Sequence, residues 1–193
     1  LFSYDGRMVA FVSNNNIYIK KIDYDSEVAV TTDGKYNSII NGVPDWTYEE
    51  EFMVESSMVW SPDNLTLCFI KYNETDVKTY SFPLYGGVYK KDVDKELYPG
   101  QYTYKYPKSG GQNSKVSVYS YDVETRKIKN IPLNTAQIEY IPRISYANNP
   151  NTLIIATLNR NQNRLELLSA NPKTIIVKSL YVDESKTWIE DVC

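Results

Sequence analysis

Residues 59–82 read "VWSPDNLTLCFIKYNETDVKTYSF", and this stretch carries the pattern on which the predicted fold depends. A turn signal at 61–64, Ser-Pro-Asp-Asn, precedes an apolar run at 65–72. The chain then turns and continues as a second run at 77–82. Pro, Asp and Asn favour turns because their backbone angles are preset or tolerant. We therefore predict a β-hairpin in which 65–72 and 77–82 are the paired strands.

The same order of turn, buried strand, Asn-rich turn and alternating strand occurs twice more. Residues 2–23, "FSYDGRMVAFVSNNNIYIKKID", are one copy, and residues 140–172 are a looser one with strands expected at 153–158 and 165–169. Recurring hairpins favour an all-β repeat architecture, and we predict a partial β-propeller. A β-sandwich is the alternative, since it also consists of short strands and turns. The length fits about three to four blades, fewer than most closed propellers contain, so we expect residues 1–193 to be a fragment of a longer chain.

Composition excludes several classes of function. The 193 residues include 18 Tyr, and aromatic residues make up 13% of the chain, which favours strands. The net charge of −3 provides no basic field for nucleic acid or anionic lipid. No stretch approaches the roughly 18–20 apolar residues of a membrane helix. Histidine is absent, which excludes a self-contained Ser-His-Asp or Cys-His centre and any His-based zinc site.

The two cysteines, Cys68 and Cys193, are far apart in sequence. Cys68 lies within the apolar run "LTLCFI" and is expected to be a buried core residue. A disulfide with Cys193 is an alternative that the sequence leaves open. We expect no metal and no cofactor.

Three consecutive carboxylates, Glu49, Glu50 and Glu51, occur in "DWTYEEEF" at residues 45–52. From the residues alone a solvated charge run is the more common meaning of such a cluster, and a site for a cation is the alternative. Thr47 and Glu50 have the spacing of a capping box, so we predict one short helical turn here. Trp46, Tyr48 and Trp60 are expected to be core residues.

Residues 41–75, "NGVPDWTYEEEFMVESSMVWSPDNLTLCFIKYNET", closely resemble the blade that carries the double-glutamate motif of the dipeptidyl peptidase IV family. The matching positions are Asp45, Trp46, Tyr48, Glu49, Glu50, Glu51, Trp60, Ser61, Pro62, Asn73 and Thr75. The resemblance continues through "YPKSGGQNSKVSVYSYDVET" at 106–125 and fades after about residue 135.

The resemblance implies the fold and activity of the whole protein. It implies an eight-bladed N-terminal propeller joined to a C-terminal α/β-hydrolase domain that carries Ser, Asp and His. We expect that domain to lie outside this chain, which has no histidine and no Gly-x-Ser-x-Gly elbow, so no catalytic residue is assigned here. The implied activity is release of N-terminal X-Pro or X-Ala dipeptides. Glu50 and Glu51 would bind the substrate's free α-amino group, while Glu49 would have a capping or structural role.

Residues 81–111 are the part least like a blade. Tyr102, Tyr104 and Tyr106 alternate with polar residues, and glycines and prolines bracket the segment, so we expect a protruding β-arm with an aromatic stripe on one face. Further tyrosines, Tyr85, Tyr89 and Tyr98, lie near a charged centre at 90–96. Aromatic rings at a water boundary favour an interface. Because the family dimerises partly through such an arm, the resemblance implies a homodimer.

Two rival functions remain at this stage. One is a non-catalytic propeller that binds a peptide or partner protein, and the other is a catalytically inactive family member. The resemblance also implies export, to a bacterial periplasm or envelope or to a cell surface. Two sequons, at Asn64 and Asn73, are compatible with secretion.

Overall fold

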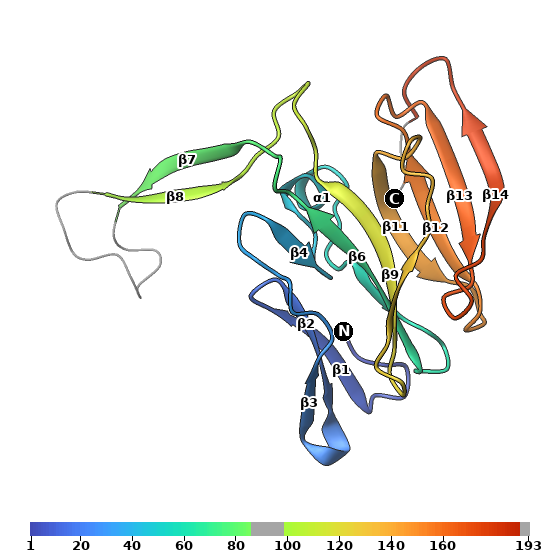
Figure 1. Cartoon of the computed structure of the whole chain (residues 1–193). Coiled ribbons are helices and arrows are strands. Elements are labelled where there is room, and N and C mark those ends of the chain that lie inside the picture. The colour runs from blue at the N-terminus through green and yellow to red at the C-terminus, as the bar shows by residue number, and fades with distance from the viewer. Residues whose placement is uncertain (86–98, 190–193) are drawn as a thin grey trace.

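The computed structural model describes residues 1–85 and 99–189. Its strands form three antiparallel sheets that stand side by side like blades, with a two-stranded arm projecting from the middle one (Figure 1). Within these residues, no helix is long and apolar enough to cross a membrane. The predicted all-β partial propeller is confirmed.

The first sheet has the order β1-β2-β3. Its elements are β1 (Met8–Ser13), β2 (Asn16–Lys21), the 3-10 helix η1 (Ile22–Tyr24) and β3 (Ser26–Ala29). The hairpin between β1 and β2 turns at Asn14 and Asn15, whose φ angles of 49° and 62° lie in the left-handed region. Asn adopts this region more readily than most residues do. The hairpin predicted within residues 2–23 is therefore confirmed.

The second sheet has the order β10-β9-β6-β4, and β5 also pairs with β6. Its elements are β4 (Ile39–Asn41), α1 (Trp46–Glu50), β5 (Met58–Trp60), β6 (Thr66–Asn73), β9 (Lys115–Asp122) and β10 (Ile128–Ile131). Strand β4 pairs with the end of β6 and β5 pairs with its beginning. These two short strands are therefore halves of one edge strand, and α1 lies in the segment that interrupts it.

The predicted hairpin of 65–72 with 77–82 is wrong, because each of the two strands pairs with a different strand. Strand β6 pairs along its whole length with β9, while β7 (Thr79–Leu84) pairs with β8 (Gly100–Lys105) to form the arm. The burial of the strands explains the exchange. Strand β6 is buried on both faces and requires two partners within the sheet, whereas most residues of β7 are exposed.

The third sheet has the order β11-β12-β13-β14. Its strands are β11 (Tyr140–Tyr146), β12 (Leu153–Leu158), β13 (Arg164–Ala170) and β14 (Val177–Glu184). The predicted pairing of 153–158 with 165–169 is confirmed in β12 and β13. Strand β5 contacts β11, so the first strands of neighbouring blades converge, as they do around a propeller's channel.

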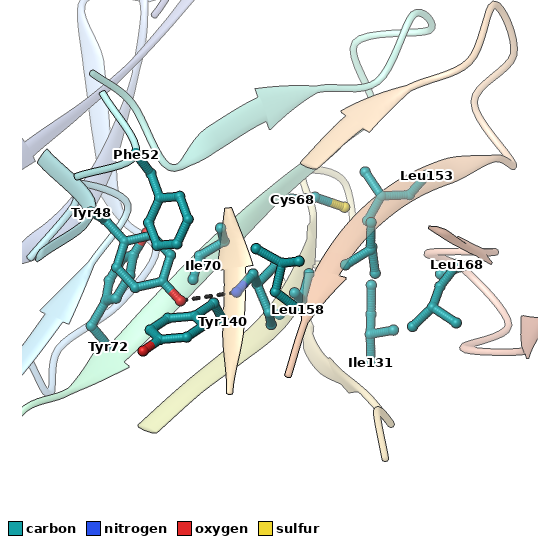
Figure 2. Close-up of a cluster of buried hydrophobic side chains, with 14 residues drawn as sticks. Tyr48, Phe52, Cys68, Ile70, Tyr72, Ile131, Tyr140, Leu153, Leu158 and Leu168 are labelled. Carbon is teal, nitrogen blue, oxygen red and sulfur yellow. Dashed lines mark hydrogen bonds between the residues drawn. The ribbon is translucent and has the colours of Figure 1, made fainter. Parts of the chain in front are cut away.

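Two hydrophobic clusters hold the blades together. One joins the first and second sheets around Ile17, Trp60 and Phe69, and the other joins the second and third sheets around Tyr48, Ile70 and Leu158 (Figure 2). Tyr48 and Trp60 are each 1% exposed, which confirms them as core residues. Trp46 is only half-buried, and it packs on the arm instead.

Cys68 belongs to the cluster between the second and third sheets, as predicted. Its Sγ lies 3.1 Å from the Tyr146 hydroxyl of β11. Burial raises the pKa of the Cys68 thiol to about 12, and the contact with Tyr146 opposes the rise only partly. A thiol with this pKa is not a nucleophile at neutral pH. Cys193 lies outside the described residues.

Candidate functional site

The predicted site lies on an insertion at the inner edge of the second blade. The N–H of Gly42 donates to the carbonyl of Ile70 at 3.0 Å, and the N–H of Ile70 donates to the carbonyl of Ser57 at 2.9 Å. The chain therefore leaves the sheet at Gly42 and rejoins it at Ser57, both opposite Ile70 of β6, and residues 43–56 between them are the insertion. Gly42 has φ +76°, and a Cβ there would lie 2.8 Å from Ile17 and Met58, so only glycine fits this close packing.

The buried carboxylate of Asp45 caps α1. Its Oδ1 accepts the N–H of Tyr48 at 3.0 Å, and its Oδ2 accepts the hydroxyl hydrogen of Ser114 at the start of β9. The predicted capping box at Thr47 is therefore wrong. Asp45 precedes the first helical residue in extended conformation, which places its carboxylate over the free N–H groups, whereas Thr47 lies within the helix.

Tyr48 connects α1 to the third blade. Its hydroxyl accepts the backbone N–H of Ile141 in β11 at 2.9 Å. Its ring lies edge-on to Tyr72 with centroids 4.8 Å apart and packs on Phe52 at 5.2 Å, and Phe52 contacts Tyr140 at 5.5 Å (Figure 2). The helix is only five residues long, so these tertiary contacts rather than its own hydrogen bonds hold it in place.

Trp46 connects the other side of α1 to the arm. Its ring centroid lies 4.1 Å from that of Tyr106, at the root of the arm. From there a continuous series of ring contacts runs outward along the arm. It passes through Tyr80, Phe82, Tyr102, Tyr104 and Tyr106.

The predicted aromatic stripe on one face of the arm is thus confirmed. Tyr80 and Tyr102 are 45% and 41% exposed, and Tyr85 is 70% exposed. Tyr89, Tyr98 and the charged centre at 90–96 lie outside the described residues.

All three carboxylates of the predicted cluster are exposed. Within residues 1–85 and 99–189, no ion pair involves Glu49, Glu50 or Glu51. Glu50 lies four residues after Trp46, so the two share a face of the helix. Burial and the neighbouring tyrosines raise the pKa of Tyr104, and the Glu50 carboxylate adds to the rise, which places Glu50 near the root of the aromatic stripe.

Glu49 and Glu50 point in different directions because they are successive residues of a helix. Successive residues point about 100° apart, and Glu49 lines a groove of about 490 Å³ beside α1. The other lining residues are Val43, Pro44, Met53, Val54 and Glu55. Glu51 closes the helix as its C-cap, with φ −95° and ψ −35°. The three glutamates therefore do not share one surface, and the role of Glu50 and Glu51 as a pair without Glu49 stays a prediction.

Sequence reasoning missed Glu74, a carboxyl group beneath the site. This side chain is 6% exposed and lies where β6 ends. Burial raises its pKa to about 7, the Asp45 carboxylate adds to the rise, and the Lys105 ammonium opposes it. Burial also raises the pKa of Asp45. In the sequence Glu74 lies within the sequon Asn-Glu-Thr, a polar stretch that predicts an exposed turn. No neighbouring residue indicates that its side chain is buried.

Lys105 fixes the root of the arm near Glu74. Its Nζ donates to the carbonyl oxygens of Val77 at 2.7 Å and Thr75 at 3.1 Å. The Tyr36 hydroxyl, from the segment before β4, donates to the carbonyl of Thr103 in β8 at 2.6 Å. The insertion, the end of β6 and the arm therefore meet in one polar junction, with α1 at its edge.

Comparison with known proteins agrees with this architecture. Residues 1–192 match the profile of the Dipeptidyl peptidase IV (DPP IV) N-terminal region. The crystal structure of Porphyromonas gingivalis dipeptidyl peptidase 4 superposes with a TM-score of 0.89 at 46% identity, covering 97% of this chain and 26% of that one.

Two curated relatives match at lower identity. A protein of Aspergillus fumigatus named "Probable dipeptidyl-aminopeptidase B" is 32% identical over 186 residues, which cover 93% of this chain and 19% of the relative. The human protein named "Prolyl endopeptidase FAP" is 35% identical over 118 residues, which cover 61% of this chain and 14% of the relative. The chain thus spans about a quarter or less of the length of each of these three proteins. By its sequence and its fold, the chain belongs to the dipeptidyl peptidase IV family and corresponds to part of that family's N-terminal region.

Proposed function

We propose that this chain is the propeller portion of a serine exopeptidase that releases N-terminal X-Pro or X-Ala dipeptides, and that Glu50 and Glu51 bind the substrate's free α-amino group. The observation that carries the proposal is the placement of α1. A buried Asp45 and a buried Tyr48 hold a short helix at the inner edge of a blade, where Glu50 and Glu51 are exposed. Membership of the family supports the same assignment.

The chemistry of the site explains how an exopeptidase would select chain ends. A free α-amino group is a cation near neutral pH, and two carboxylates satisfy its N–H donors with charge-assisted hydrogen bonds. An internal peptide segment brings no charge, and it would cover the carboxylates without pairing them, which costs free energy. Glu50→Gln and Glu51→Gln variants of the full-length protein test the proposal, with Glu49→Gln as the control.

The catalytic Ser, Asp and His are proposed to lie in a C-terminal α/β-hydrolase domain. The purified 193-residue chain should therefore release no dipeptide, because an acyl-transfer centre requires a base such as histidine and this sequence has none. Incubation with a Gly-Pro chromogenic substrate checks this, with the full-length protein as the positive control. Hydrolysis by the chain alone, at a rate that follows its concentration through purification, would contradict the proposal.

The arm is proposed to form part of a homodimer interface. The arm projects away from the blades (Figure 1), and Phe82 and Tyr102 of the aromatic stripe lie farther from the root than Tyr80 and Tyr104 do. Large amphipathic rings at a water boundary are typical of interfaces. The contacts of Lys105 and Tyr106 at the root hold the arm in place before a partner binds.

A shortened arm tests this interface. Ser81 pairs with Thr103, so replacing residues 82–102 with Asn-Gly should close the hairpin as a tight turn, remove Phe82 and Tyr102 from the stripe and leave the root intact. We expect the shortened full-length protein to be monomeric at low micromolar concentration, as measured by light scattering. The control Gln162→Gly places the same Asn-Gly pair in the turn between β12 and β13 and should remain dimeric. A shortened-arm variant that stays dimeric refutes the interface.

A further inference from the structure

Tyr48 has three polar connections in three different directions. Its N–H donates to Asp45 Oδ1 at 3.0 Å, and its carbonyl accepts the N–H of Val54 at 3.0 Å. Its hydroxyl accepts the N–H of Ile141 at 2.9 Å. One residue therefore joins the start of α1, the segment that follows α1, and the neighbouring blade.

On the neighbouring blade, the Tyr48 hydroxyl binds the backbone N–H of Ile141, which lies in a break in the pairing of β11 with β12. The register between β11 and β12 shifts after Tyr140 and resumes at Arg143. Such a bulge removes residues from the ladder, and a buried N–H left without an acceptor is costly. Ile141 is fully buried, and the Tyr48 hydroxyl supplies the missing acceptor, as the dashed line in Figure 2 shows.

This bond fixes the rotation of α1 about its own axis. At about 100° per residue, Glu50 points roughly 200° from Tyr48, and Glu51 points roughly 300° from it. A helix of five residues has few internal hydrogen bonds with which to hold its orientation. Whatever fixes Tyr48 therefore fixes the directions in which both carboxylates point. The contact between Trp46 and Tyr106 acts on the opposite face.

We propose that Tyr48 is a positioning residue for the substrate's ammonium group, and that it acts through the orientation of Glu50 and Glu51. The inference rests on the proposed function, and it adds a residue that does not itself touch substrate. Its consequence is specific: loss of the Tyr48 hydroxyl should weaken recognition of the amine and leave the rest of the substrate site unchanged.

Tyr48→Phe in the full-length protein isolates the hydroxyl, because the ring that fills the core remains. Two competitive inhibitors serve as probes: an aminoacyl pyrrolidide with a free α-amine, and the same acyl pyrrolidide without the amine. We expect the Ki of the amine compound to rise about 10-fold or more, since small misplacements of binding groups have effects of this size. The Ki of the des-amino compound should stay within about 2-fold. A Ki does not depend on the fraction of molecules that fold, so partial misfolding does not mask the result.

Tyr146→Phe is the matched control. The Tyr146 hydroxyl also crosses from the third blade to the second, where it contacts Cys68 at 3.1 Å, but it lies away from α1. The control should leave both Ki values unchanged.

Three outcomes overturn the inference. If Tyr48→Phe weakens both inhibitors equally, or neither, the tyrosine has only a structural role. If Tyr146→Phe reproduces the amine-specific loss, the effect belongs to the blade interface in general. If Glu50→Gln also leaves the amine compound unaffected, the proposed function fails together with the inference; if Glu50→Gln weakens it and Tyr48→Phe does not, only the inference fails.

Discussion

Changing Glu50 or Glu51 to glutamine in the full-length protein is expected to lower kcat/KM for a free-amine dipeptidyl substrate by roughly 30-fold to several thousand-fold. The range corresponds to the loss of about 2–5 kcal/mol when one partner of a desolvated charge pair is removed. Glutamine keeps the shape and one acceptor oxygen of the side chain, so the loss reports the charge. Neither side chain belongs to the hydrophobic core, and we expect the thermal midpoint of the protein to change little.

Glu49→Gln separates a specific pair from a general field of negative charge. Glu49 is on the same helix and is also exposed, but it lines the groove beside α1. Its replacement by glutamine removes the same charge. We expect its kcat/KM to stay within about 3-fold of the wild-type value, as steady-state kinetics on all three variants will measure. A loss as large as that of Glu50→Gln would show that net charge matters more than position. An unchanged kcat/KM in Glu50→Gln or Glu51→Gln would mean that the three glutamates are a solvated charge run and not a binding site.

Glu74→Gln is expected to stabilise the protein above neutral pH and to have little effect at acidic pH. The folded-state pKa of Glu74 is about 7, against an ordinary value of 4.5. The folded state therefore holds a proton that the unfolded state releases as the pH rises from 4.5 to 7, and ionisation favours unfolding. The stabilising contribution is fully present below pH 4.5 and is lost by about pH 7. The difference of about 2.5 pH units corresponds to about 3 kcal/mol.

The comparison of pH 5 with pH 8 measures this effect. The charged groups that act on Glu74 are Asp45 and Lys105, and both remain in the variant. We expect the thermal midpoint of Glu74→Gln to exceed that of the wild type by roughly 3 °C or more at pH 8, and the two proteins to agree closely at pH 5. Scanning calorimetry of the full-length proteins provides the measurement. Glu124→Gln, at the exposed turn between β9 and β10, is the control and should show no such difference.

A difference in stability between variant and wild type that is the same at both pH values would mean that Glu74 titrates normally. A Glu74→Gln protein less stable than the wild type at pH 8 would mean that its carboxylate makes a favourable bond that glutamine cannot replace. Either result would contradict the prediction that ionisation of the buried Glu74 destabilises the folded protein.

Local chemistry let the sequence predict the hairpins that close within a few residues. The hairpin of β1 and β2 depends on two asparagines that accept a left-handed backbone, and the hairpin of β12 and β13 depends on a short turn between alternating runs. The aromatic stripe of the arm was predicted from alternating tyrosines, whereas Glu50 and Glu51 were predicted as a site only from the resemblance to a family motif. For the hairpins and the stripe, neighbours in the chain are also neighbours in space, so the relevant interactions can be read from spacing alone.

Contacts between distant segments could not be predicted in this way. Strand β6 takes β9 as its partner across the whole arm, because a strand buried on both faces is stabilised by a second buried strand and not by the exposed β7. Asp45 caps α1 with one carboxylate oxygen, and the other accepts the hydroxyl hydrogen of Ser114, 69 residues away and just before β9. The sequence by itself determined the class of fold, the family and the positions of Glu50 and Glu51. Only the tertiary structure decided which way those carboxylates point, because the orientation of α1 depends on the N–H of Ile141, 93 residues beyond Tyr48, which only folding brings within hydrogen-bonding distance. The burial of Glu74 beside Asp45 and Lys105 likewise depends on segments that are distant in the sequence.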